Sequence, residues 1–294
     1  MKNTLTHIFI VLTVFTSLML SGCELINPSE EIPAYLKVGD PLVQVDPGRN
    51  YQVSAGIKDI WLSRNDENLG IYPVPSVIPF IPEAENKFTV NGGIFLSGFS
   101  SFREPYPFWK GIQFEASPNG GDTIVLNPVF EYFTLDSFVV FKYEEKFEGA
   151  SFQLQSLLNG NPAEVSLERT TEGFDRNGGR FNFSGTASNM EVISTVWFKL
   201  PQSGNNRIFL EVTYNNTIPF NTGLEYRNAV DFGRLGGQVF VNSQGEWNTI
   251  YYDFNDDVRG LPAEMEFRLF LRADGENESG YIILDNIRMV HFAE

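Results

Sequence analysis

Cysteine and histidine are nearly absent from this chain of 294 residues, which has Cys23 as its one cysteine and His7 and His291 as its two histidines. A single thiol excludes an intramolecular disulfide. His7 lies in an N-terminal segment that we expect to be removed, so the mature chain would keep His291 alone. One histidine excludes Ser-His-Asp and Cys-His catalysis, and a multi-histidine zinc site, within one chain.

Basic residues are scarce as well, with 21 Lys and Arg against 37 Asp and Glu and a formal net charge of −16. A surface of this sign repels phosphate backbones, which excludes nucleic acid as a partner. Neutral glycans remain compatible with such a charge.

Paired carboxylates are the one catalytic device that this composition leaves. The candidate acids are Asp253, Asp256, Asp257 and Asp285. Asp256 and Asp257 follow a predicted strand, a position typical of a solvated turn, and no strand carries carboxylates in a glycosidase pattern. We predict that the protein is not an enzyme.

The N-terminus has the pattern of an export signal: Lys2 precedes an apolar run, residues 8–20, that is too short to span a bilayer comfortably. Residues 20–23 (LSGC) then resemble the lipobox of bacterial lipoproteins. The resemblance implies a signal peptide at 1–22 that is cut before Cys23, and acyl chains such as palmitate on Cys23. Two or more chains give stable anchoring, because each buried methylene contributes about 0.8 kcal/mol.

Residues 23–31 are predicted to be an acylated tether, because this polar stretch cannot bury enough apolar area to fold alone. Ser29, Glu30 and Glu31 resemble the acidic signals that direct lipoproteins to the surface of polysaccharide-degrading Gram-negative bacteria. A plain solvated linker is the alternative. From the lipobox and this motif we expect a lipid-anchored protein of the outer membrane, at the cell surface.

Residues 32–134 are predicted to form a small β-sandwich with turn signals at 91–93 (NGG) and 118–121 (PNGG). Residues 57–62 (IKDIWL) and 69–75 (LGIYPVP) resemble PEGA-like and carboxypeptidase-regulatory-like modules, which are small immunoglobulin-like sandwiches. The resemblance implies a spacer module. The expected strands are 34–38, 56–63, 69–72, 87–90, 112–116 and 123–126.

Residues 135–147 mix aromatic and charged side chains. A flexible linker would be polar or rich in Gly and Ser, so we expect a linker that packs against both of its neighbours.

Residues 148–294 show strands at the spacing of an all-β sandwich. Three motifs, 178–183 (GGRFNF), 245–254 (GEWNTIYYDF) and 280–289 (GYIILDNIRM), resemble galactose-binding-like jelly rolls, the fold of many carbohydrate-binding modules. The predicted fold class is therefore all-β, with two sandwich domains of which the second is a jelly roll. Its expected strands are 152–157, 165–169, 180–184, 193–200, 207–214, 237–241, 249–254, 266–272 and 281–292.

Asp285 interrupts an apolar strand, and a buried carboxylate is costly unless something binds it. The jelly-roll resemblance implies a structural calcium ion held by Asp285 and, from the first strand of the domain, Glu148. The alternative is a carboxylate that is satisfied by backbone donors or by an arginine. We expect no other cofactor.

Jelly-roll modules that bind sugar combine exposed aromatic rings with polar side chains. Trp197 and Trp247 lie in strand patterns, so we expect them in the core. The candidate ligand-binding residues therefore come from the turn at 216–223 and from a Gly-rich loop after it. They are Tyr214, Asn215, Tyr226, Asp231 and Arg234.

These expectations indicate a non-catalytic envelope lipoprotein that recognises a glycan through its C-terminal jelly roll. The alternative is an accessory lipoprotein that binds another outer-membrane protein in a transport, secretion or adhesion assembly. A glycan site needs an exposed aromatic ring flanked by polar groups, whereas a protein interface needs a wide apolar patch with few charges.

Overall fold

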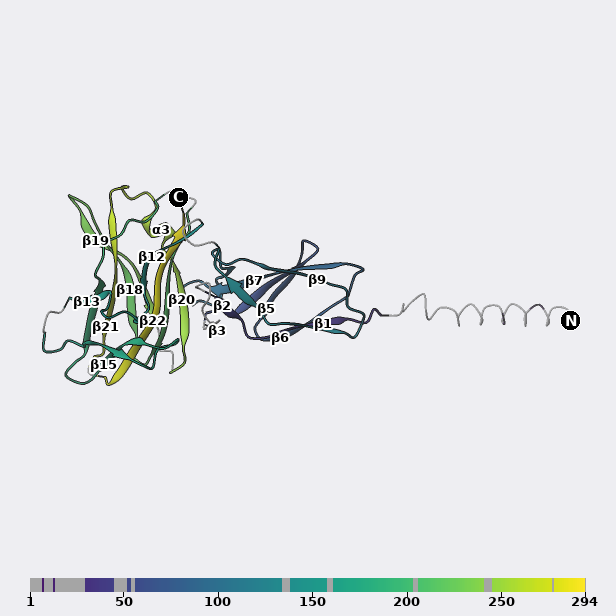
Figure 1. Ribbon diagram of the computed structural model, residues 1–294, viewed down its shortest axis with the longest axis horizontal. Helices are drawn as coiled ribbons and strands as arrows, with labels where there is room; N and C mark the ends of the chain where they lie inside the picture. Colours follow the sequence, from purple (N-terminus) through teal and green to yellow (C-terminus); the bar gives the residue numbers. More distant parts are fainter. Residues whose placement is uncertain are drawn as a thin grey trace.

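The computed structural model (Figure 1) describes most of the chain from Glu30 onward. The predicted signal segment, Cys23 and most of the tether lie outside the described residues. No helix in the described part is both long and apolar enough to cross a membrane. The described residues are 30–44, 52–53, 56–133, 138–157, 161–202, 206–240, 245–276 and 278–293, together with His7 and Thr13.

The N-terminal half is all strand and forms the N-terminal sandwich, whose two layers share one core. One layer has the order β5-β4-β7-β8, with β9 also paired to β7, and the other consists of the sheets β10-β1-β6 and β11-β2-β3. The strands are β1 (Ala34–Val38), β2 (Leu42–Gln44), β3 (Gln52–Val53), β4 (Asp59–Arg64), β5 (Glu67–Pro73), β6 (Ser76–Phe80), β7 (Asn86–Phe95), β8 (Arg103–Pro105), β9 (Ile112–Ala116), β10 (Thr123–Leu126) and β11 (Val129–Glu131).

Alternation of buried and exposed residues explains these strands. Ala34, Leu36 and Val38 of β1 are buried, while the residues between them are exposed. Since successive side chains point to opposite faces, this strand can bury one apolar face and leave the other in water. All six predicted strands of this half overlap observed ones, and β2, β3, β6, β8 and β11 were not predicted.

The predicted turn at 91–93 is wrong, because these residues lie inside β7. A Cβ atom on Gly92 would lie 3.1 Å from the Trp109 ring, and one on Gly93 would lie 1.7 Å from Asp59 Oδ1. The glycines therefore make room for neighbouring side chains within a strand. The predicted turn at 118–121 is confirmed.

The C-terminal half forms the C-terminal sandwich, which has two antiparallel sheets around a second core. Its elements are β12 (Val139–Glu145), β13 (Leu154–Ser156), β14 (Leu167–Thr170), β15 (Gly178–Phe183), β16 (Asn189–Ser194), β17 (Ile208–Asn216), β18 (Phe220–Arg227), β19 (Phe232–Phe240), β20 (Asn248–Asp253), α3 (Asn255–Val258), β21 (Glu266–Asp274) and β22 (Gly280–Phe292). Helix α3 is the one helix of the described part after Glu30. The all-β prediction is confirmed.

Three segments of this half differ from the sequence-based expectation. Residues 135–147, expected to be a linker, contain β12, which pairs with β22. The strand expected at 193–200 is β16 and ends at Ser194. The turn expected at 216–223 is short, because β18 begins at Phe220.

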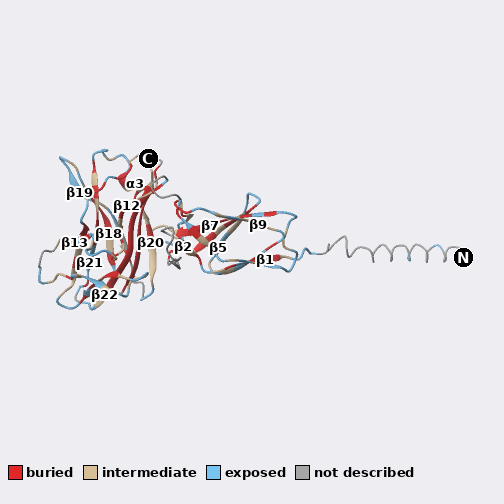
Figure 2. Ribbon diagram, in the orientation of Figure 1, coloured by how far each residue is buried: buried red, intermediate tan, exposed pale blue. Residues whose placement is uncertain are grey.

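The two sheets of the C-terminal sandwich have different outer surroundings. The sheet β14-β15-β22-β17-β20, with β12 paired to β22, is called the covered sheet here, and the sheet β13-β16-β21-β18-β19 is called the open sheet. The N-terminal sandwich abuts the C-terminal one with one end, and buried residues lie on both sides of this junction (Figures 1 and 2).

Aromatic packing joins the two sandwiches. Phe209, Tyr251 and Val290 of the covered sheet belong to the same core cluster as the N-terminal sandwich. The Tyr106 ring lies 5.3 Å from the Phe209 ring and 4.8 Å from the Tyr251 ring, measured between centroids. This contact contributes to the burial of β17, in which every residue is buried. The outer face of the open sheet carries no comparable cover from the described residues.

Candidate ligand-binding face

The outward face of the open sheet follows from strand alternation. Along β21, Phe267, Leu269, Leu271 and Ala273 belong to the core of the C-terminal sandwich, so the residues between them point outward. Register then places the outward residues of the neighbouring strands beside them. The described side chains of this ligand face are Asn189, Glu191, Ile193, Asn221, Glu225, Arg227, Phe232, Arg234, Glu266, Arg268, Phe270, Arg272 and Asp274.

A buried carboxylate organises the centre of the ligand face. Glu225 is 2% exposed, and both of its oxygens are engaged. Arg234 donates to Oε1 through Nε at 3.1 Å and Nη2 at 2.8 Å, while Arg268 Nε donates to Oε2 at 2.7 Å. Arg234 also reaches Glu191 at 2.5 Å, across the sheet. Charge-assisted hydrogen bonds of this kind hold the guanidinium groups in fixed positions.

An aromatic ring lies beside this network. Trp197 is half-buried, and its ring has the guanidinium carbon of Arg227 at 4.0 Å and that of Arg268 at 4.4 Å from its centroid. Arg227 is held in turn by Glu266 at 2.9 Å. Such cation–π contacts fix the orientation of the ring.

Phe232 adds an exposed ring to the same end of the face. It is the cross-strand partner of Arg227 and is 61% exposed. An exposed ring next to fixed guanidinium groups is the combination that stacks a sugar ring and hydrogen-bonds its hydroxyl groups.

The opposite end of the ligand face is a small hollow of about 190 Å³. Asn221 and Arg272, which are cross-strand partners, line it together with Asp274. The Oδ1 atom of Asn221 is shielded from solvent and has no hydrogen-bond partner among the described residues. A ligand hydroxyl would satisfy it, since an orphaned buried acceptor is costly.

Charges on the ligand face balance. It carries four arginines, Arg227, Arg234, Arg268 and Arg272, and four carboxylates, those of Glu191, Glu225, Glu266 and Asp274. In a chain of net charge −16, this is a locally neutral surface. It favours a polar ligand without a strong charge.

The structure does not bring the five predicted ligand-binding residues together. Tyr214 lies in the covered sheet and is 1% exposed, so the prediction that it offers its ring to a ligand is wrong. Its ring packs at 5.2 Å from that of Phe240. Asn215 is 9% exposed, and its amide donates to Gly245 and accepts from the Tyr281 hydroxyl.

The other three predicted residues are near the open sheet. Tyr226 is in β18, but its ring packs against the core and lies over Gly233, so it faces inward. Asp231 lies exposed in the turn between β18 and β19, where its N–H donates to the Asn228 side chain at 2.8 Å. Arg234 alone lies on the ligand face.

Asp285 and Glu148, the predicted calcium ligands, bind neighbouring parts of one loop. Asp285 is 1% exposed, and its oxygens accept the N–H groups of Asn286 at 2.7 Å and Asp175 at 3.0 Å. Glu148 accepts the N–H and the side-chain amide of Asn177 at 3.0 and 2.7 Å. The structure thus matches the alternative of a carboxylate satisfied by backbone donors. The described residues hold no cluster of three or more His, Cys, Asp or Glu side chains that could bind a metal ion.

Burial and hydrogen bonding shift the pKa values of these two carboxyl groups in opposite directions. Burial raises the pKa of Asp285 to about 6, against the two N–H donors, which lower it. Desolvation also acts on Glu148, but the hydrogen bonds from Asn177 and the charge of Arg176 outweigh it and lower the pKa of Glu148.

Sequence reasoning missed most of the ligand face. Trp197 was expected in the core, yet it is half-buried on the outside, and Trp247 is half-buried against Phe174. A usable signal was present in β21, where Glu266, Arg268 and Arg272 alternate with Phe267, Leu269 and Leu271. The partners across the sheet depend on the strand register, which cannot be read from the sequence.

No protein-family model matches the chain, and no curated protein matches it. Among solved structures it is similar to a family 11 carbohydrate-binding module from Clostridium thermocellum in complex with a β-1,3-1,4-mixed-linked tetrasaccharide, at 17% identity over 50% of this chain and 94% of that one, with a TM-score of 0.34. A carbohydrate-binding module of the β-sandwich superfamily described for promiscuous specificity shares 12% identity over 89% of this chain and 99% of its own, with a TM-score of 0.37. A module described for specific mannan recognition shares 12% identity over 53% and 99%, with a TM-score of 0.33. Scores at this level establish neither a shared family nor a ligand for this chain.

Proposed function

We propose that this protein is a non-catalytic cell-envelope lipoprotein that binds a neutral glycan on its ligand face. The observation that carries the proposal is the rigid pairing of Glu225 with Arg234 and Arg268 beside the exposed Phe232 ring. Donors that are already held in place lose little conformational entropy when a ligand binds.

The shape of the face favours a chain of several sugar units over a single one. From Asn221 to Arg227 the face follows six steps of β18, which is about 20 Å at ~3.4 Å per residue. Polar groups occur at both ends of this path, with Asn221 and Arg272 at the hollow and Arg227 near Phe232.

Attachment to the membrane is the second part of the proposal, and the lipobox-like residues 20–23 support it. Acylated Cys23 would hold the protein in the outer membrane at the cell surface, and the N-terminal sandwich, a PEGA-like spacer in this interpretation, would carry the ligand face away from the lipid. Replacement of Cys23 by Ser should move the chain from the membrane fraction to the soluble fraction. A Cys23→Ser protein that stays in the membrane fraction to the wild-type extent would refute the anchor.

The glycan proposal is tested by measuring the affinity of the purified full chain for a panel of soluble neutral polysaccharides. Phe232→Ala should weaken binding about 2- to 12-fold, since stacking of one ring contributes ~0.5–1.5 kcal/mol. Phe138→Ala is the matched control, because Phe138 is also 61% exposed but lies outside the ligand face. Equal binding by both variants, or no binding to any neutral polysaccharide, would reject the proposal.

A protein partner is the second candidate, and one observation favours it. Val230 is 92% exposed and Phe232 is 61% exposed, at the turn between β18 and β19. The charged network next to this turn does not form the wide apolar patch that stable protein interfaces need. A co-purifying envelope protein that is lost on Phe232→Ala, without any polysaccharide binding, would favour this alternative.

A further inference from the structure

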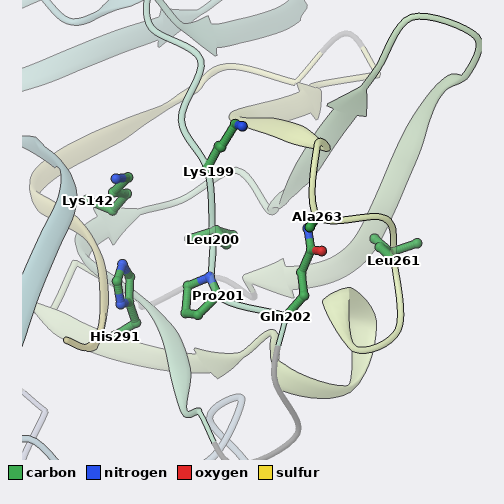
Figure 3. Close-up of a pocket in the computed structure, with 8 residues that line it drawn as sticks. All are labelled: Lys142, Lys199, Leu200, Pro201, Gln202, Leu261, Ala263 and His291. Carbon is green, nitrogen blue, oxygen red and sulfur yellow. The ribbon is translucent and has the colours of Figure 1, made fainter. Parts of the chain in front are cut away.

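A pocket of about 500 Å³ lies at one end of the C-terminal sandwich (Figure 3). Lys142 of β12 and His291 of β22 come from the covered sheet. Residues 199–202 come from the connection between β16 and β17, and Leu261 and Ala263 from the connection between α3 and β21. The volume lies within the range of small-molecule sites.

A β-bulge explains how Lys142 comes to line this pocket. The pairing of β12 with β22 shifts register between Phe141 and Tyr143, so Lys142 is the extra residue of the bulge. Bulges change the direction of a side chain and occur often next to functional sites.

The charge of the pocket is opposite to that of the protein. Lys142 and Lys199 line it, and no Asp or Glu does. The chain as a whole has 37 acidic and 21 basic residues, so two lysines without an acid among the lining residues form a local anion-attracting site.

Gln202 indicates that the ligand both donates and accepts hydrogen bonds. Both polar atoms of its side chain, Oε1 and Nε2, are shielded from solvent, and neither has a hydrogen-bond partner among the described residues. A donor and an acceptor that are both left unpaired cost stability. A ligand hydroxyl can donate to Oε1 and accept from Nε2, whereas an inorganic anion such as phosphate mainly accepts.

The rest of the lining is apolar. Leu200, Pro201, Leu261 and Ala263 provide a hydrocarbon surface beside the polar groups. A sugar ring carries C–H groups next to its hydroxyls, so it can contact both kinds of lining.

We infer that this pocket binds a carboxylated sugar, that is, a uronic acid unit, with its carboxylate at one of the two lysines, Lys142 or Lys199, and its hydroxyl groups at Gln202. None of the lining residues belongs to the set that defines the ligand face, and the inference does not depend on glycan binding there.

The test measures binding of galacturonate and digalacturonate to the full chain, with galactose and inorganic phosphate as comparison probes. Galacturonate should bind, and galactose should bind at least 10-fold more weakly, because it lacks the carboxylate. The double variant Lys142→Gln/Lys199→Gln should lose at least 10-fold in affinity. The control Lys37→Gln changes an exposed lysine of β1 and should bind as the wild type does.

Gln202→Leu separates a binding role from a structural one. It removes two unpaired buried polar atoms, so it should raise the Tm while weakening galacturonate binding and leaving phosphate binding unchanged. Equal affinity of the double lysine variant and the wild type would overturn the inference. So would phosphate binding as tight as galacturonate binding, or a Gln202→Leu variant that binds galacturonate normally.

Discussion

The hydroxyl of Tyr132 lies 2.7 and 2.9 Å from the two carboxylate oxygens of Glu211, although the two residues belong to different sandwiches. Tyr106 donates to the same carboxylate, and Arg288 Nη1 lies 3.6 Å from it. Glu211 is 2% exposed, and this burial raises its pKa. Since two donors of this carboxylate come from the N-terminal sandwich, separation of the sandwiches would leave it with fewer partners in a partly apolar surface.

Tyr132→Phe is therefore expected to destabilise the whole chain. The substitution keeps the ring and removes one donor from a buried carboxylate, which costs about 1–3 kcal/mol. Urea denaturation followed by fluorescence measures this loss. Tyr35→Phe serves as the control, because Tyr35 is 36% exposed on β1. A Tyr132→Phe protein as stable as the control would show that Glu211 does not depend on this contact.

The pKa of about 6 for Asp285 predicts how stability depends on pH. A carboxyl group whose pKa is higher in the folded state than in the unfolded state stabilises the fold when protonated. Its contribution is complete below about pH 4 and is lost as the pH rises through about 6. From pH 4 to pH 7, wild type should lose about 3 kcal/mol relative to Asp285→Asn, as ~2 pKa units at ~1.4 kcal/mol each imply.

In the same experiment, Glu148→Gln should reveal the opposite dependence of stability on pH. The lowered pKa of Glu148 means that its contribution is present above the unfolded pKa and is lost as the pH falls. Relative to this variant, wild type should become less stable toward low pH. Parallel pH profiles of wild type and Asp285→Asn would contradict the expectation for Asp285.

Calcium is expected to leave the loop around Asp175 unchanged. Backbone N–H groups already bind both oxygens of Asp285, and Asn177 binds Glu148. A ligand that binds only the native state must raise the Tm, so equal Tm values in calcium and in a chelator are the predicted result. A Tm that rises with calcium and falls in Asp285→Asn would restore the metal site.

Gly93→Ala should destabilise the N-terminal sandwich by more than about 1 kcal/mol, because overpacking forces neighbouring groups apart. The added Cβ would lie 1.7 Å from Asp59 Oδ1. Gly149→Ala is the matched control, since its Cβ would be 3.3 Å from the nearest atom, the carbonyl oxygen of Ser151. Equal unfolding midpoints for the two variants would show that β7 accommodates a side chain at this position.

The same glycines show what the sequence could and could not predict. Asn91, Gly92 and Gly93 have the composition of a turn, but the reason for the glycines is the approach of Asp59 from β4 and of Trp109 from the connection between β8 and β9. Local propensity therefore failed where tertiary packing decides. By contrast, alternation of apolar residues located β9 and β17, because one face of each strand packs toward a sandwich core.

The residues of the candidate site divide in the same way, into those that a local pattern places and those that tertiary packing places. Tyr214 has the same phase in the strand as Ile208, Leu210 and Val212, so the pattern that predicted β17 already placed its ring on the core face. Arg234 was found because a polar residue in a Gly-rich segment is visible in the sequence. Its partners Glu225 and Glu191 come from two other strands, and only the observed register brings them together.

The Glu225 network predicts the largest effect of a substitution on the ligand face. In Arg268→Gln, the buried carboxylate of Glu225 keeps Arg234 but loses its closest charged partner, which lies at 2.6 Å. Loss of one partner of a buried ion pair leaves charge uncompensated, and we expect a cost of about 2–4 kcal/mol. Arg272→Gln, an exposed outward arginine of the same strand, should change stability by less than about 0.5 kcal/mol. Adding Glu225→Gln to Arg268→Gln removes the stranded charge, so the double variant should be more stable than Arg268→Gln alone. A double-mutant cycle by urea denaturation measures this coupling, and a coupling energy near zero would show that the arginine does not hold the carboxylate.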